Sequence, residues 1–220
     1  MKLELAMEIA QQAVEWLKDS CERIEIAGGV RREKPEPHDV EIVATPRFAS
    51  LSRPQMTLLD SRGPNSTIVE RVNLLDSRIH QLVKEGTFQL GKPNKNGGKA
   101  PFGKRVYRIG FLDEQLDVFV VLPPAQWGVV FTMRTGDAEF THRLMSAGWP
   151  SGLHFNQGHL ESWMTSGGKA ITGGKLPTDI EPKRQVLDTP EEVDVFRLLK
   201  MNWVEPKNRS GVGPDGPRTT

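Results

Sequence analysis

Three carboxylates in two apolar segments are the residues whose types and spacing could do chemistry. Asp39 and Glu41 are one residue apart at a segment that predicts a strand over residues 40–44, and Asp117 interrupts the apolar run of residues 115–122. Because side chains alternate between the faces of a strand, Asp39 and Glu41 share one face. If the strand of Asp117 pairs beside them, three acids share a small volume and cannot all stay ionised without a cation. The pattern predicts a divalent-metal site.

A glycine and arginine segment precedes these acids. Gly28 and Gly29 allow unusual backbone dihedrals and a close approach of backbone N–H groups to a ligand, and Arg31 and Arg32 offer charge-assisted contacts to phosphate. An ordinary turn beside a solvated basic pair is the alternative for this segment, as an exposed sheet face is for the acids. The combination favours a metal and phosphate site, because an acid within a buried strand is costly without a partner.

Composition limits the class of protein. The 220 residues carry a net charge of +1 and are 37% hydrophobic, which is typical of a globular chain with one large domain or two small ones. We find neither an apolar run of roughly 20 residues nor a signal-peptide core, so we expect no membrane association and a cytoplasmic, nucleoid or viral location. A lone cysteine, Cys21, fits a reducing compartment. With so little net charge, any contact with nucleic acid must come from local patches.

Hydrophobic periodicity and breakers predict an α+β fold. The acids and the glycine turn lie between an amphipathic helix and a long polar loop, and the third acid lies in a hairpin. The expected elements are helices at 3–18, 67–85, 125–132 and 137–147, strands at 24–27, 40–44, 86–90, 105–111 and 115–122, loops at 46–66 and 91–103, a hairpin around 156–158, and a helix that Thr189 caps and that ends near Met201.

The motifs together resemble those of a known superfamily. The glycine pair followed by Asp39-Val40-Glu41-Ile42 resembles the signature of the nucleotidyltransferases that include DNA polymerase beta. The landmarks that resemble family X polymerases, in family order, are Gly28-Gly29-Val30-Arg31-Arg32, Gln115-Leu116-Asp117-Val118-Phe119, Thr135-Gly136-Asp137 with Phe140, and Trp203-Val204-Glu205-Pro206-Lys207-Asn208-Arg209. The resemblance implies a minimal form: a catalytic palm with a small mixed sheet at 1–123, a thumb-like α+β domain at 124–209 and a flexible tail at 210–220. A lyase domain is not expected.

The resemblance also implies roles for single residues. Asp39, Glu41 and Asp117 are the expected catalytic residues and would bind two Mg²⁺ ions, with Mn²⁺ as the alternative ion. Gly29 and Arg32 would contact the triphosphate, and Thr135 and Gly136 would lie beside the sugar. The full expected nucleotide site is Gly28, Gly29, Arg32, His38, Thr135, Gly136, Asp137 and Thr141. Lys99, Lys104 and Arg105 would bind DNA, although a merely solvated basic loop is the alternative.

Some positions depart from the family pattern. Glu41 stands where these polymerases usually have aspartate, Gly29 replaces a serine, and His38 replaces a glycine. Met133 and Arg134 replace an aromatic pair before the Thr-Gly turn, which puts sugar discrimination in doubt.

The expected reaction is attack of a nucleic-acid 3′-hydroxyl on the α-phosphate of a nucleoside triphosphate, with release of pyrophosphate. Primer–template or gapped DNA is the expected partner of a monomeric enzyme. One alternative is a template-independent transferase, or one that modifies a protein, an RNA or a small molecule. A catalytically inactive DNA-binding module is the other. The Trp203 to Arg209 pattern argues against a transferase that modifies a protein, an RNA or a small molecule. The presence of all three acids argues against the inactive module.

Overall fold

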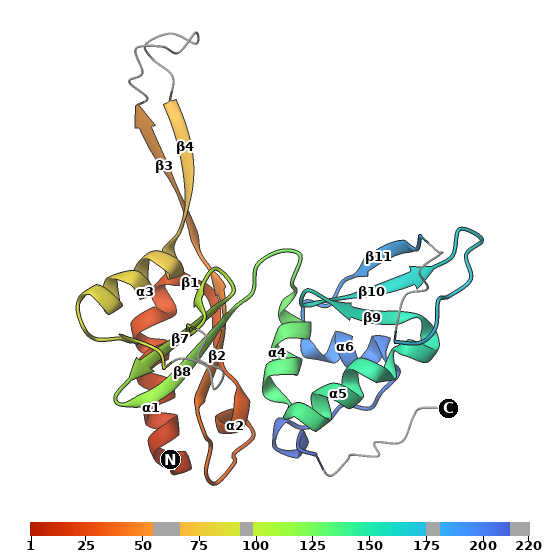
Figure 1. The fold of residues 1–220 in the computed structure, drawn as a ribbon, viewed down its shortest axis with the longest axis horizontal. Coiled ribbons are helices and arrows are strands. Elements are labelled where there is room, and N and C mark those ends of the chain that lie inside the picture. Colours follow the sequence, from red (N-terminus) through yellow and green to blue (C-terminus); the bar gives the residue numbers. More distant parts are fainter. Residues whose placement is uncertain (55–66, 93–98, 175–180, 212–220) are drawn as a thin grey trace.

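The chain forms two lobes that lie side by side (Figure 1). The computed structural model describes residues 1–54, 67–92, 99–174 and 181–211. The first lobe ends with strand β8, and helix α4 (Trp127–Thr135) begins the second. Parts of the predicted basic loop (93–98) and tail (212–220) lie outside the described residues. Within the described residues, no helix combines the length and apolar character needed to cross a membrane.

A mixed sheet forms the centre of the first lobe. Its strands are ordered β1-β2-β8-β7-β5, and β6 pairs with β7. The β2–β8 pair is parallel and the other pairs are antiparallel. The strands are β1 (Cys21–Ile26), β2 (Val40–Pro46), β5 (Gln89–Leu90), β6 (Phe102–Gly103), β7 (Val106–Phe111) and β8 (Glu114–Val120). This helix-flanked mixed sheet confirms the predicted α+β fold.

Two helices, α1 (Leu3–Leu17) and α3 (Leu74–Lys84), supply the rest of this core. Apolar residues three or four apart put one face of each helix against the sheet. Ile9 of α1 and Ile79 of α3 are buried in the same cluster as Ile42 of β2. The sheet that carries the acids is thereby held on a rigid support.

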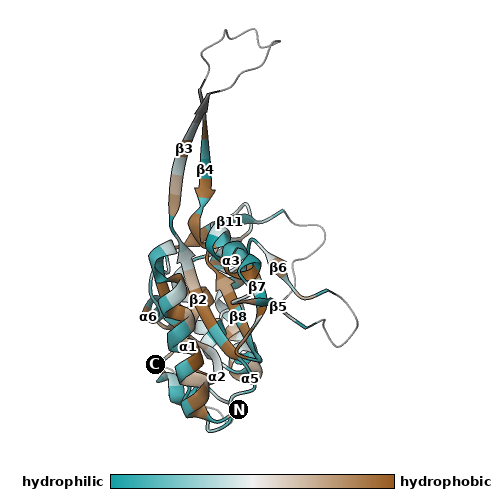
Figure 2. Ribbon diagram, turned by 90° about the vertical axis from the view of Figure 1, so that its left-hand side faces the viewer, coloured by the Kyte–Doolittle hydropathy of each residue, from teal (hydrophilic) through white to brown (hydrophobic). Residues whose placement is uncertain are grey.

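The predicted loop at 46–66 is wrong over residues 48–54, and the first half of the predicted helix at 67–85 is also wrong. Strands β3 (Phe48–Pro54) and β4 (Thr67–Asn73) pair antiparallel in a two-stranded ribbon that projects from the lobe (Figures 1 and 2). Residues 55–66 lie outside the described residues. Val69 and Val72 fit a helical period, but β-branched side chains favour a strand, and the helix begins only after Asn73 caps it.

The second lobe packs three helices against a three-stranded antiparallel sheet of order β11-β10-β9. Val129, Phe140 and Phe196, one from each helix, meet in its core. The hairpin predicted around 156–158 is confirmed, with Gln157 and Gly158 at positive φ. The elements after α4 are α5 (Ala138–Ala147), β9 (Leu153–Asn156), β10 (His159–Met164), β11 (Lys183–Leu187) and α6 (Glu192–Leu198). Sequence patterns did not predict β11.

Two predicted turns differ in detail. The glycine turn is a one-turn helix, α2 (Gly28–Arg31), which Gly28 enters at φ +61°. Thr189 was predicted to cap the last helix, but Glu191 is its cap, in a reciprocal pair with Asp194. The Thr189 hydroxyl instead donates to Gln126, 2.8 Å away, because this segment packs on the start of α4. The helix also ends at Leu198, before the predicted Met201.

Candidate active site

Three carboxylates gather at one end of the paired strands β2 and β8. Glu41 and Asp117 are direct partners in the parallel register, so their side chains leave the same face of the sheet. Asp39 lies one residue before β2. Asp117 is almost fully buried, whereas Asp39 and Glu41 are half-buried. The spacing of two residues and the strand register together bring the three predicted acids into one neighbourhood.

Burial and mutual repulsion perturb two of these acids. Burial raises the pKa of Asp39, and the negative charge of Asp117 raises it further. Burial also raises the pKa of Glu41, to about 7, with an added contribution from Asp39. Ionised acids in this setting are unfavourable, and a bound cation would relieve both causes.

Two arginines approach the acids from different sides. Arg108, opposite Asp117 in the β7–β8 register, binds it with both ends of its guanidinium: Nε lies 2.9 Å from Oδ1 and Nη2 lies 2.7 Å from Oδ2. Arg134 of α4 stacks on the ring of Phe119 at 3.8 Å. Burial lowers the pKa of Arg134, while attraction by Glu41 and Asp117 opposes that change. The side chains of the protein thus partly neutralise the acids.

The donor set fits magnesium in chemistry, since Mg²⁺ prefers carboxylate oxygens. As they stand, no three acidic, histidine or cysteine side chains in the described ranges form a ready cage for an ion. Asp117 is turned to Arg108, and Glu41 lies against the backbone of Gly28, where an added Cβ would be 2.0 Å from Oε2. Binding of an ion by all three acids requires one or both of these side chains to turn.

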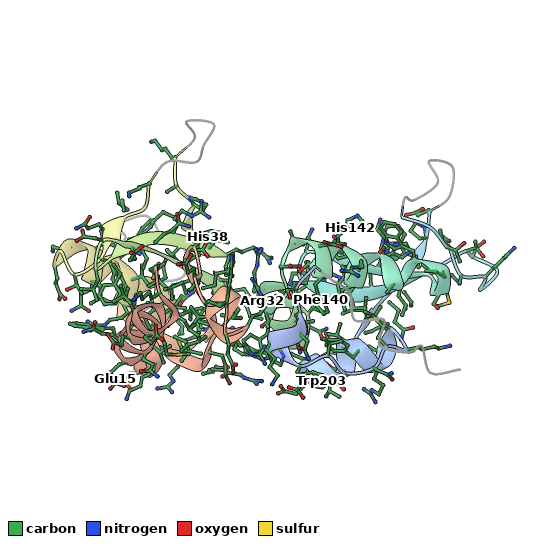
Figure 3. All side chains as sticks on the ribbon, turned by 90° about the horizontal axis from the view of Figure 1, so that it is seen from below. Glu15, Arg32, His38, Phe140, His142 and Trp203 are labelled. Carbon is green, nitrogen blue, oxygen red and sulfur yellow. The ribbon has the colours of Figure 1, made fainter. Side chains whose placement is uncertain are left out.

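A cleft of about 640 Å³ opens beside Asp39 and Glu41, between the two lobes. One wall comes from the first lobe and the other from the end of α4 and one face of α5, whose residues follow helical spacing. Figure 3 labels Arg32 and His38 on the first lobe and His142 on the second. The lining is Arg32, His38, Asp39, Glu41, Met133, Arg134, Gly136, Asp137, Ala138, Thr141, His142 and Met145.

Most of the expected nucleotide residues meet in this cleft. Its lining includes Arg32, His38, Gly136, Asp137 and Thr141. Three expected residues, Gly28, Gly29 and Thr135, lie outside this lining. Gly28 is buried against Glu41. Gly29 is buried, and a Cβ there would face Pro37 and Lys34.

Thr135 is also fully buried outside this lining, and its hydroxyl oxygen accepts a hydrogen bond of 2.6 Å from Arg31. None of the three expected DNA-binding residues is in the lining of the cleft. Lys99 and Lys104 are exposed, and Arg105 lines a different cavity, of about 280 Å³, together with Arg134.

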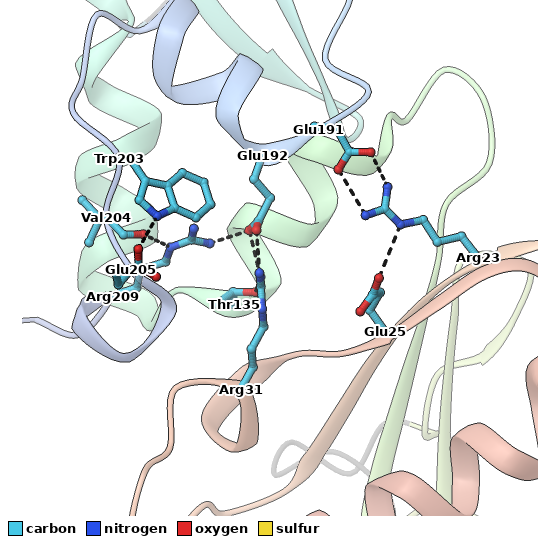
Figure 4. Close-up of polar contacts among 10 residues, drawn as sticks. All are labelled: Arg23, Glu25, Arg31, Thr135, Glu191, Glu192, Trp203, Val204, Glu205 and Arg209. Atoms are coloured by element: carbon cyan, nitrogen blue, oxygen red, sulfur yellow. Dashed lines mark hydrogen bonds and ion pairs between the residues drawn. The ribbon is translucent and has the colours of Figure 1, made fainter.

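An ion-pair strap joins the lobes behind the cleft (Figure 4). We define it as Arg31 of α2, Glu192 of α6 and Arg209. Arg31 donates to both carboxylate oxygens of Glu192, at 2.9 and 2.6 Å, and the fully buried Arg209 donates to the same carboxylate. Arg32, its neighbour, donates to the carbonyl oxygen of Thr135 at 2.6 Å. The strap and the Arg23–Glu191 ion pair, also drawn in Figure 4, are two of the contacts that join the lobes.

Sequence reasoning missed Arg108, Glu192 and two cleft residues of α5, His142 and Met145, although it predicted Thr141. Residue type alone does not separate Arg31, which holds the strap, from Arg32, which reaches the cleft, but the family resemblance assigned only Arg32 to the nucleotide. The replacement of an aromatic pair by Met133 and Arg134 was the one available signal, and both residues line the cleft.

A comparison with family models addresses the second lobe. Residues 131–210 match the model described as DNA polymerase beta thumb, which is 80 of the 220 residues. No curated protein matches the chain. The matched range contains the Thr135-Gly136-Asp137 and Trp203 to Arg209 motifs, and it includes α5, α6 and all three strands of the second sheet. The match supports a relationship of this chain to the family X-like DNA polymerases.

Proposed function

We propose that this protein transfers a nucleotide from a nucleoside triphosphate to the 3′-hydroxyl of a DNA strand, in short gap filling or primer extension. The observation that carries the proposal is the register of Glu41 with Asp117 beside Asp39, on one wall of a cleft. The other wall belongs to the lobe that matches a polymerase thumb. This reaction needs acids and a phosphate-binding site on one side of a cleft. It also needs a lobe that binds nucleic acid on the other side.

Asp39, Glu41 and Asp117 would hold two Mg²⁺ ions. When bound, the ions would favour the ionised hydroxyl and offset the charge that develops on the phosphate oxygens. The bond from the 3′-oxygen to the α-phosphorus forms, the bond from that phosphorus to pyrophosphate breaks, and the hydroxyl proton is released. Arg32 orients the phosphates from the cleft wall. The α5 face, with Thr141 and His142, limits where the sugar and base lie.

Primer extension on gapped, recessed and single-stranded DNA tests the proposal, with Mg²⁺ and Mn²⁺ compared. We expect template-dependent extension that Asp39→Asn and Glu41→Gln each reduce by about 100-fold or more. Glu8→Gln is the matched control, because Glu8 is an exposed acid on α1 and its loss should leave the rate unchanged. Wild-type rates in both acid variants would overturn the proposed site.

A labelled nucleoside triphosphate in the same assay also separates the alternative reactions. Extension without a template would assign a template-independent transferase. Label on protein, RNA or a small molecule instead of the primer would assign the modifying transferase. If the wild-type protein binds DNA but incorporates no nucleotide into any acceptor, the inactive DNA-binding module would be favoured.

A further inference from the structure

A third space, a cavity of about 350 Å³, lies at the seam between the lobes. It shares Arg32 and Asp137 with the cleft, so the two spaces adjoin at these residues. Figure 3 labels Arg32 at this seam. We call the cavity the basic seam pocket, and its lining is Arg32, Glu33, Lys34, Pro35, Asp137, Lys207 and Ser210.

Three cations from both lobes face this pocket. Arg32 and Lys34 come from the first lobe and Lys207 from the second. Lys34 is half-buried, yet within the described part of the chain neither lysine ammonium has an ion pair or hydrogen bond. Lys207 is exposed, so both ammonium groups are available to an acceptor that a ligand supplies.

The acids of the pocket do not neutralise these cations. Asp137 accepts backbone N–H groups with both oxygens, from Phe140 at 2.8 Å and from Gly211 at 2.6 Å. It therefore serves as the cap of α5 and holds the end of the second lobe. Glu33 is exposed. Three cations against two acids leave the pocket with a net positive charge.

Lys34 is also held in position beside the glycine segment. Its backbone N–H donates to the carbonyl oxygen of Gly29 at 2.9 Å, and its Cδ would lie 3.8 Å from a Cβ on Gly29. The stem therefore packs where a side chain of residue 29 would extend. The hydrogen bond fixes the backbone of Lys34 beside the glycine segment, and Lys34 lines the pocket together with Arg32.

We propose that the basic seam pocket binds polyphosphate: the terminal phosphates of the triphosphate before the reaction, and pyrophosphate after it. The link to the reaction rests on the proposed function. Phosphate oxygens accept several charge-assisted hydrogen bonds at once, which suits a pocket that offers two ammonium groups, a guanidinium and the Ser210 hydroxyl. Because Lys34 and Lys207 belong to different lobes, polyphosphate bound between them also holds the lobes together.

Calorimetric titration with tripolyphosphate and with pyrophosphate, in EDTA and without DNA, tests the pocket itself. We expect Lys34→Ala and Lys207→Ala each to weaken binding by about tenfold. Lys84→Ala and Lys183→Ala remove exposed lysines from α3 and β11 and should leave affinity unchanged. Lys34→Arg should restore most of the affinity. No binding to the wild type, or the same loss in all four alanine variants, would overturn the pocket.

Steady-state kinetics then connects the pocket to the reaction. Lys34→Ala and Lys207→Ala should raise KM for the triphosphate and the inhibition constant of pyrophosphate by about tenfold, with kcat changed little. Extension with an unchanged KM in both variants would overturn the inference and leave the proposed function intact. Lysine-dependent pyrophosphate binding by a protein that extends no primer would support the pocket and overturn the proposed function.

Discussion

Replacing Glu192 with alanine removes the acceptor that joins Arg31 and Arg209 across the lobes. The side chains of Glu192 and Arg209 are 7% and 0% exposed, so solvent cannot replace the lost partner. Arg209 would keep its hydrogen bond from Nε to the carbonyl oxygen of Val204, while its Nη2 is already buried without a partner. Removal of one member of a buried ion pair leaves an uncompensated charge and costs about 3–5 kcal/mol.

Thermal and urea unfolding at pH 7 measure this cost. For a chain of this size each kcal/mol lowers Tm by about 2–4 °C, so we expect Glu192→Ala to melt roughly 6–20 °C below the wild type. Glu139→Ala is the control, because Glu139 forms an exposed pair with Arg143 that contributes about 0.5 kcal/mol or less. A Tm for Glu192→Ala within about 2 °C of the wild type would refute the strap as a stabilising contact.

Low pH should reduce the difference in stability between the wild type and Glu192→Ala. Burial would raise the pKa of Glu192, but hydrogen bonds from Arg31 and the charge of Arg209 bring it below its usual value of 4.5. A lowered pKa means that the stabilisation is present above pH 4.5 and is lost as pH falls through the lower, folded-state value. The stability gap between wild type and Glu192→Ala should therefore narrow below pH 4.5, and a gap that widens there would contradict this assignment.

Other residues give three further tests. In EDTA, Glu41→Gln should stabilise the protein by up to about 3 kcal/mol more at pH 8 than at pH 5. Burial and the charge of Asp39 raise the pKa of Glu41 from 4.5 to about 7, so the wild type loses stability as pH rises between these values, and the loss is complete above pH 7. Equal shifts in urea unfolding at the two pH values would refute this. Gly28→Ala should cost about 1–3 kcal/mol more than Gly86→Ala, since both have positive φ but only the Gly28 Cβ meets Glu41. Cys21, whose pKa burial raises to about 12, should react with a thiol reagent only as the protein unfolds, and immediate labelling would contradict its burial.

The strongly periodic parts of the fold were predictable from the sequence. Helix α1 has one clear apolar face, and the β7–β8 hairpin has apolar alternation around a short turn. The β3–β4 ribbon was missed because little of it is buried, so its sequence carries no core pattern. Polar residues and prolines made one strand resemble a loop, and Val69 and Val72 made the other resemble a helix.

Some residues of the candidate site were predictable from the sequence and others were not. Asp39, Glu41 and Asp117 were predictable because an acid within an apolar strand stands out from its neighbours. Arg108 and Glu192 were not, because their partners are set by strand register and by the contact of the two lobes. A sequence of one lobe contains no information about which charge of the other lobe it will meet.

The strap also constrains the order in which a newly synthesised chain can mature. All strands of the first sheet lie between residues 21 and 120, so this sheet can form while the remainder is still being translated. Arg31 then lacks its carboxylate acceptor until Glu192 has been translated. Arg209, the second donor to that carboxylate, is translated later still. This contact between the lobes can therefore form only after all strands of the first sheet have been translated.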